Sequence, residues 1–367
     1  MYTHTTTDFQ KKAPARLHEL DALRGISAFS VMLFHFTINA NKQKLGWAFN
    51  SGVTGVDIFF MISGFVVFLS ISKIKNWQDF VVKRFARLYP AFWSCLLITV
   101  SFVLLFEPEN INAFSVLANA TMVPSYFSVE DLDGSYWTLV IELTFYFWIL
   151  IIHIFKGINR IEYIGFFTIW AVIAFHEFTL FYPNSYLSVT QKVQLVNHFP
   201  LFYSGILFYN MKNKPNWQRY IPLILCSLFA SFYLHDKGGR SQYIVSAHLH
   251  YLLITLFHLI FALFCLDKLR FLKFPPLLFL GKISYCLYLI HQYVGLRLIS
   301  TFTDDFRINI YFSLSLSITI CISIAYLVNR FVEKPCNRLI RNYYSKKFAD
   351  NIRENNIKEM RLPPGCA

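Results

Sequence analysis

The chain has 367 residues, of which 55% are hydrophobic and 19% aromatic, while only 15% are charged. Soluble domains carry about 25% charged residues, so this composition excludes an ordinary soluble protein and indicates a polytopic helical membrane protein. The formal net charge of +13 is also typical of nucleic-acid binding. Here, however, the basic residues fall in short segments between apolar runs, which is the pattern that membrane topology produces. We therefore expect membrane lipids, and no nucleic acid, as partners.

Ten apolar runs predict transmembrane helices, because each is near the length that crosses about 30 Å of hydrocarbon. They cover residues 22–40, 53–72, 88–106, 136–155, 160–181, 195–211, 220–235, 247–267, 277–300 and 308–331. The predicted fold is thus an all-α, multi-pass integral membrane bundle of about ten helices.

Lysine and arginine gather in alternate connecting segments, and cytoplasmic segments are the ones enriched in these residues. The 107–135 segment, on the opposite side, has no Lys or Arg and several acidic residues. Both termini are therefore predicted to be cytoplasmic. We expect a cytoplasmic tail at 1–20, a membrane domain at 21–332 and a cytoplasmic tail at 333–367. We expect no soluble second domain, since the tail after residue 332 is short.

Arg24 and His35 lie inside the first apolar run, in the stretch DALRGISAFSVMLFHF. They are eleven positions apart, so a helix returns them to nearly the same face about 16 Å apart. Ionisable groups are costly at membrane depth, and they usually face a cavity and have a function. Arg24 is expected near the cytoplasmic face and His35 in the outer half of the membrane.

Two carboxylates follow on neighbouring predicted helices. Asp57 lies in GVTGVDIFFMISGF, and Glu142 lies in SYWTLVIELTFYFW. Counting residues from the predicted helix ends puts both at the outer depth of His35, so we expect the three groups in one layer. A histidine beside a carboxylate is a plausible general base with its orienting partner. The alternative is a structural polar cluster that holds helices together, and convergence from three helices favours a catalytic role.

Residues 83–93 read KRFARLYPAFW, with Arg84 and Arg87 three positions apart and so on one helix face. A positive anchor at the cytoplasmic face explains this pattern well. The alternative is a phosphate clamp, because guanidinium groups match phosphate oxygens.

Ser284, Tyr288, His291 and Gly295 recur at helical spacing in GKISYCLYLIHQYVG. This stripe either packs against neighbouring helices or lines a cavity. We expect Tyr288 and His291, with Ser63, to line the substrate cavity. The seven cysteines show no paired spacing, and the sequence contains no Walker loop, dinucleotide-binding loop or metal-ligand triad, so we expect no metal site.

Five of these stretches together resemble the acyltransferase-3 family of integral membrane acyltransferases. The matching pieces occur in the family's order over residues 20–292; they are LDALRGISAFSVMLFHF, GVTGVDIFFMISGF, KRFARLYPAFW, YWTLVIELTFYFW and LGKISYCLYLIH. Members of this family include bacterial O-antigen and exopolysaccharide O-acetylases. Two departures stand out. Glu142 is followed by Leu143 where relatives often have a second acid, and the basic run before Arg87 is thinner than usual.

The resemblance implies that cytoplasmic acyl-CoA, usually acetyl-CoA, donates an acyl group to a sugar hydroxyl on the outer side of the bacterial inner membrane. It implies that His35 is the catalytic histidine, Arg24 its essential partner and Arg84 with Arg87 the arginine pair. We combine this with the residue analysis. His35 would be the base, or an acyl carrier; Asp57 or Glu142 would support it, and Arg24, Arg84 and Arg87 would bind CoA phosphates.

Two other functions fit the sequence. A non-catalytic transporter or flippase of a lipid-linked glycan would also have about ten helices with a polar interior. An acyltransferase with a non-glycan acceptor, such as a macrolide, would share every motif. The sequence defines neither the acceptor nor the oligomeric state, and an oligomer is compatible with it.

Overall fold

In the computed structural model, residues 17–74, 76–238 and 240–360 are described. They form an all-helical structure in which these residues contribute no strand. Its α-helices are α1 (His18–Thr37), α2 (Ala40–Leu45), α3 (Gly55–Ile71), α4 (Trp77–Phe106), α5 (Ala113–Ala120), α6 (Trp137–Ile154), α7 (Ile161–Glu177), α8 (Pro183–Lys192), α9 (Leu195–Asn213), α10 (Ile221–Tyr233), α11 (Ala247–Cys265), α12 (Pro275–Ile290), α13 (Tyr293–Ser300), α14 (Ile310–Val328) and α15 (Lys334–Met360).

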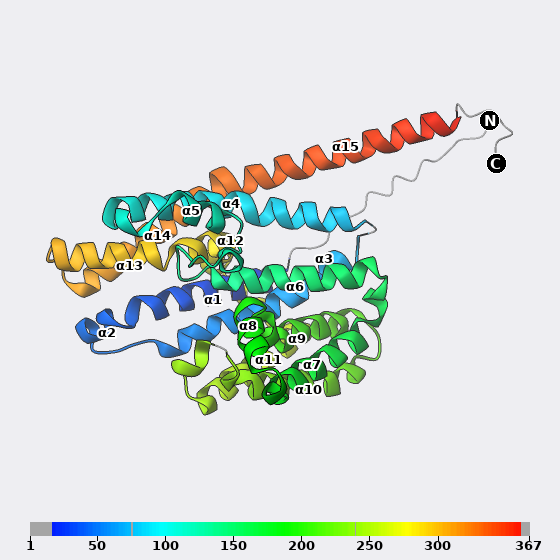
Figure 1. The fold of residues 1–367 in the computed structure, drawn as a ribbon, viewed down its shortest axis with the longest axis horizontal. Helices are drawn as coiled ribbons and strands as arrows, with labels where there is room; N and C mark the ends of the chain where they lie inside the picture. The colour runs from blue at the N-terminus through cyan, green and yellow to red at the C-terminus, as the bar shows by residue number, and fades with distance from the viewer. Residues whose placement is uncertain (1–16, 75, 239, 361–367) are drawn as a thin grey trace.

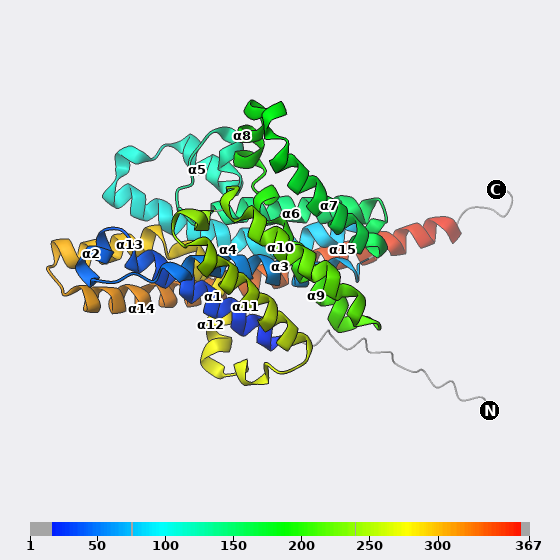
Figure 2. The same ribbon diagram turned by 90° about the horizontal axis from the view of Figure 1, so that it is seen from below.

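The long helices form two groups with α3 and α6 between them. Helices α1, α4, α12, α13 and α14 lie along the long axis of the molecule, and α7, α9, α10 and α11 gather beside them (Figure 1). Helix α3 packs on α1 from the first group and on α9 from the second. Helix α15 extends well beyond the other helices at one end (Figure 2). The central position of α3 means that its residues face both groups.

Two pairs of glycines allow these helices to approach closely. A Cβ atom on Gly25 of α1 would overlap the backbone of Leu280–Gly281 in α12, and one on Gly281 would overlap the Asp21 carbonyl. Gly64 of α3 and Gly205 of α9 face the partner backbone in the same reciprocal way. Small residues at such crossings let helix backbones touch in membrane proteins. Arg24 and Ser63, each next to one of these glycines, are thereby fixed in position.

Each of the ten predicted spans overlaps a helix, but fewer helices are long and apolar enough to cross a membrane. Within the described residues, six qualify on length and hydropathy, and the bent pair α12–α13 makes a seventh if it counts as one span. The runs at 22–40, 195–211 and 220–235 do not qualify. Helix α1 begins with charged residues, α9 carries buried polar groups, and α10 has only 13 residues, or about 20 Å. Ten spans with cytoplasmic termini stay a prediction.

The predicted span 277–300 is not one helix. Helices α12 and α13 meet at a 74° bend around His291 and Gln292. The cause is the incoming 107–135 segment: Asp133 accepts a hydrogen bond of 2.8 Å from the Tyr293 N–H, and Gly134 lies against the Gln292 side chain. A side chain that takes over a backbone partner in this way is an established cause of helix kinks.

The 107–135 segment also folds back along α4 instead of forming a loose loop. The Trp93 indole N–H donates to the Ala120 carbonyl at 2.9 Å, and the Tyr89 hydroxyl donates to the Thr121 carbonyl at 3.2 Å. Trp93 is about 20 Å from the end of α4 that leads into this segment. Of the two predicted tails, residues 1–16 and 361–367 lie outside the described residues, while α15 accounts for most of the second.

Candidate active site

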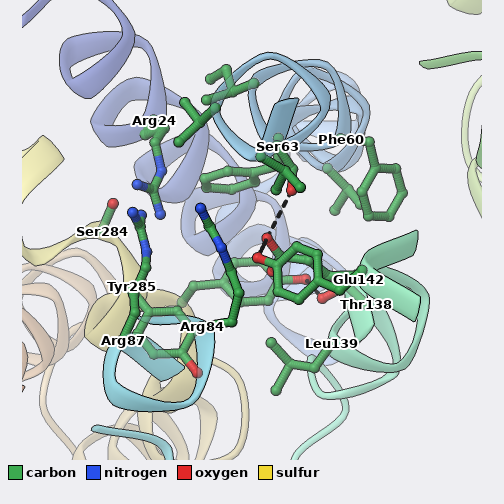
Figure 3. Close-up of a pocket in the computed structure, with 17 residues that line it drawn as sticks. Arg24, Phe60, Ser63, Arg84, Arg87, Thr138, Leu139, Glu142, Ser284 and Tyr285 are labelled. Atoms are coloured by element: carbon green, nitrogen blue, oxygen red, sulfur yellow. Dashed lines mark hydrogen bonds between the residues drawn. The ribbon is translucent and has the colours of Figure 1, made fainter. Parts of the chain in front are cut away.

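Three arginines from two helices meet at the junction of two cavities. Arg24 of α1 and Arg84 and Arg87 of α4 line both an inner cavity of about 70 Å³ and a larger, polar cavity of about 440 Å³. Figure 3 shows the three guanidinium groups turned toward the same space. We call the second space the basic cavity, because Lys83, Lys282 and Arg341 also line it. The structure therefore brings together the three residues that were predicted to bind CoA.

Arg84 is held ready for a ligand. Its guanidinium carbon lies 5.4 Å from the centres of both the Phe80 and the Tyr146 rings. Its buried Nε has no hydrogen-bond partner among the described residues. Stacking on aromatic rings orients the guanidinium plane. The arrangement leaves Nε as a donor for an anion.

Glu142 lies with the arginines. Its Oε1 accepts a 2.8 Å hydrogen bond from Ser63 Oγ on α3 and a short one from the Tyr146 hydroxyl on its own helix (Figure 3). Glu142 and Ser63 both line the inner cavity, as does Arg24. Since a carboxylate next to guanidinium groups stabilises them, Glu142 is placed to support the arginine cluster. Ser63 lines the cavity as expected.

His35 lies beside His291, with 5.2 Å between ring centres. His291 is fully buried, and its Nδ1 is 2.7 Å from the Tyr288 carbonyl. A carbonyl only accepts, so Nδ1 carries the proton and Nε2 presents a lone pair. That Nε2 has no partner among the described residues. The two histidines thus form a pair in which one member has a fixed tautomer.

Tyr288 separates this histidine pair from the inner cavity. Its ring lies 5.4 Å from His291 and 5.6 Å from Phe59, and its hydroxyl accepts a 3.0 Å hydrogen bond from Thr138. Ser284 and Tyr288 line the inner cavity, whereas His35 and His291 do not. Of the predicted stripe, two members therefore face the cavity and His291 lies behind Tyr288.

The expectation that His35, Asp57 and Glu142 share one layer is wrong. Helices α1 and α3 are antiparallel, and Gly55 contacts Ser27 of α1. Asp57, two residues further along α3, is therefore about level with Ser27, which is about 12 Å along α1 from His35.

The carboxylates themselves occupy two further levels. Asp57 Oδ2 lies 3.6 Å from His250 Nε2 in a separate cavity. Glu142 bonds Ser63, six residues or about 9 Å beyond Asp57. The sequence count failed because helix lengths do not fix the vertical offset between two packed helices.

Asp133 is a site residue that the sequence analysis did not single out. It is fully buried; Oδ1 accepts from the Ser135 N–H at 2.8 Å, and Oδ2 from the Tyr293 N–H. Burial raises the pKa of this carboxyl to about 6, against the opposing effect of its hydrogen bonds. It fixes the bend that carries His291. Its Asp-Gly-Ser context signals only a turn, and the partner 160 positions away gives no local signal.

Comparison with known proteins identifies the family. The family model described as an acyltransferase domain, Acyl_transf_3, matches residues 17–328. The chain belongs to this family. The match includes all three arginines, both carboxylates and both histidines of the site, as expected from the motifs.

Two relatives illustrate the similarity. The O-acetyltransferase OatA of Staphylococcus aureus is 25% identical over 378 residues, covering 91% of this chain and 60% of the relative. The putative peptidoglycan O-acetyltransferase YrhL of Bacillus subtilis is 31% identical over 147 residues, covering 35% of this chain and 22% of the relative. The chain thus spans about three fifths of OatA. No solved structure matches the chain.

Proposed function

We propose that this protein is a membrane O-acyltransferase that moves an acetyl group from cytoplasmic acetyl-CoA to a hydroxyl of a cell-surface or lipid-linked glycan. The observation that carries the proposal is the junction of Arg24, Arg84 and Arg87 between the basic cavity and the inner cavity. A transferase with a charged, soluble donor needs such a junction. It must hold phosphates in water while the reactive end enters a water-poor interior.

The residues at this junction fit the donor's chemistry. Guanidinium groups form forked, charge-assisted hydrogen bonds with phosphate, and the free Nε of Arg84 is such a donor. On the other side, the inner cavity is lined by apolar side chains such as Val56, Phe59 and Leu139. These would surround the pantetheine arm and acyl group. The thioester supplies the activated acyl group when the donor is bound.

Beyond the inner cavity, the His35–His291 pair would handle the proton. We propose that His35, the half-buried member, accepts the proton of the acceptor hydroxyl. The ring of His291 lies 5.2 Å from that of His35, measured between ring centres. The Nε2 lone pair of His291 would then accept a hydrogen bond from protonated His35 or from a water. A histidine is suited to general base catalysis near neutral pH, and the fixed tautomer of His291 would let its Nε2 accept rather than donate. Tyr288 would have to move to connect the pair with the donor.

Acceptor and location rest on the relatives. Both are named O-acetyltransferases, and one name specifies peptidoglycan. We extend this only to the class of acceptor, a hydroxyl-bearing glycan of the cell envelope, and to the bacterial cytoplasmic membrane as location. The apolar helices support an integral membrane protein. Acetyl-CoA would come from the side of α15 and the basic cavity.

The test measures free thiol released from acetyl-CoA by membranes that contain the protein, with and without the host's envelope glycan. An acetyltransferase releases CoA thiol and adds alkali-labile acetate to the glycan. Arg84→Ala should reduce both signals at low acetyl-CoA. Membranes with folded protein that release no thiol above an empty-vector control would favour a non-catalytic transporter.

A further inference from the structure

A second polar cavity lies at the other end of α3, separate from the arginines. It has a volume of about 20 Å³. Its polar lining comes from α3, α9, α10, α11 and the segment between α10 and α11: Asp57, Asn197, His198, Ser231, His235, Ser241 and His250. We call it the histidine cavity. Asp57 and the three histidines around this small cavity have no role in the donor site described above.

Four side chains in this lining have an unsatisfied polar atom. Asp57, Asn197, His235 and His250 are between 5% and 7% exposed. Asn197 Oδ1 and the Nδ1 atoms of both histidines have no hydrogen-bond partner among the described residues, and Asp57 Oδ2 has only His250 Nε2 near it, beyond hydrogen-bond distance at 3.6 Å. A buried polar atom without a hydrogen-bond partner destabilises the folded state. Four of them around one cavity indicate a site that a polar ligand completes.

The unsatisfied atoms define the ligand's chemistry. The carboxylate and amide oxygens accept hydrogen bonds, so the ligand must donate. His250 has Nε2 3.6 Å from Asp57 Oδ2, and its ring stacks on that of His235 at 4.2 Å. With Nε2 facing the carboxylate, the Nδ1 side is left for the ligand. A hydroxyl group both donates and accepts, and a cavity of this size holds one water-sized group.

A metal ion is a weaker candidate. The part of the chain that the structure describes has no group of three or more His, Cys, Asp or Glu side chains placed to hold one. Neighbouring aromatic rings hold one of these histidines in place. The His198 ring lies 5.1 Å from Phe60 and 5.8 Å from Trp137, and neither of these two residues lines the histidine cavity.

The location also fits an acceptor. Val56 lines the inner cavity and its neighbour Asp57 lines the histidine cavity, so the two cavities lie at the same level on different faces of α3. Phe60 lines the inner cavity and contacts His198 of the histidine cavity. The basic cavity reaches Ser70, about 20 Å further along α3. Two ligands that enter from opposite ends would thus reach the same level of α3, near Val56–Phe60.

We propose that the histidine cavity binds a hydroxyl group of the acyl acceptor, which approaches from the end of the bundle opposite the arginines. This inference rests on the proposed function. Asp57 and Asn197 accept hydrogen bonds from the acceptor, and His250 donates to it or accepts from it through Nδ1. Asp57, which the sequence assigned to His35, thereby becomes an acceptor-binding residue.

The experiment uses the full-length protein in membranes and two titrations. One varies the host's envelope glycan extract at saturating acetyl-CoA; the other varies acetyl-CoA at saturating extract. His250→Gln and Asn197→Ala should raise the half-saturating extract concentration at least about tenfold, which corresponds to one lost hydrogen bond of about 1.4 kcal/mol. The half-saturating acetyl-CoA concentration should stay within about twofold. Arg84→Ala should show the reverse pattern.

His176→Gln is the matched control. His176 is also buried and its Nε2 also has no partner among the described residues, but its Nδ1 bonds Tyr186 and it lies outside the histidine cavity. It should change neither half-saturating concentration. Ser231→Val gives a second test that does not remove a charge-bearing group: Ser231 lines the cavity and bonds only the Ser227 carbonyl of its own helix in the contacts described. The extra methyl groups should fill the space and raise only the extract value.

The outcomes are separable. If the wild type releases CoA and acetylates the extract, but folded His250→Gln, Asn197→Ala and Ser231→Val keep the wild-type extract value, the cavity does not bind the acceptor. If the variants instead weaken binding of extract and of acetyl-CoA equally, and His176→Gln does the same, the histidine cavity has only a structural role. This result would overturn the inference as well. If the wild type itself releases no CoA thiol, the proposed function has failed.

Discussion

Asp133→Asn should change how the protein's stability depends on pH. The Asp133 carboxyl is fully buried, and burial raises its pKa from 3.8 to about 6. A raised pKa means that the folded state holds the proton more tightly than the unfolded state. The stabilisation is therefore complete below pH 3.8 and is lost as the pH rises through about 6. An asparagine has no such proton to lose.

The size of the effect follows from the two pKa values. The interval from 3.8 to about 6 corresponds to about 3 kcal/mol, at about 1.36 kcal/mol for each pH unit. The free energy of unfolding of the wild type, relative to Asp133→Asn, should therefore fall by up to this amount between pH 4 and pH 7. Differences between the two proteins are used because titration of other groups cancels in them.

Thermal unfolding in detergent, followed by tryptophan fluorescence from pH 4 to pH 8, measures this difference. Glu109→Gln is the control, since Glu109 is an exposed acid in the same segment; its curve should run parallel to the wild type. Parallel curves for Asp133→Asn as well would refute the argument. They would mean that burial does not raise the pKa of Asp133 in the folded protein.

Four further predictions concern the site and the helix crossings. His35→Ala should lower acetyl transfer by about 10²–10⁴-fold, the contribution of a general base, with unchanged acetyl-CoA binding; wild-type rates from the purified variant would contradict the role. Arg84→Ala should raise the half-saturating acetyl-CoA concentration about 10–100-fold for lost charge-assisted bonds, with Arg84→Lys between; an unchanged value would leave only a topology anchor. Glu142→Gln should raise the half-saturating acetyl-CoA concentration and leave that of the acceptor unchanged, because Glu142 lies with the arginines. An effect confined to the acceptor titration would contradict this role. Gly205→Val should destabilise by at least about 1–3 kcal/mol through overpacking against the Met61 backbone, seen as a lower Tm in detergent, and an unchanged Tm would show that α3 and α9 can separate.

The sequence by itself determined the class of protein and most of the important residues. Composition and apolar run length indicate a helical membrane protein because water-free surroundings force every backbone polar group into a helix or a closed barrel. Arg24, His35 and Glu142 stand out because charge is rare in apolar runs. Helix periodicity correctly put Arg84 and Arg87 on one face, at the junction where Arg24 joins them.

Only the tertiary structure decided which of these residues meet. The offset of α3 against α1 is set by contacts such as Gly55 on Ser27, and it moves Asp57 away from His35 and toward His250. The bend at His291 depends on Asp133, which is 160 positions from its partner Tyr293. Local sequence fixes periodicity and polarity, but packing between distant segments fixes register and depth. The basic cavity and the histidine cavity, at opposite ends of α3, could therefore not be foreseen from the chain alone.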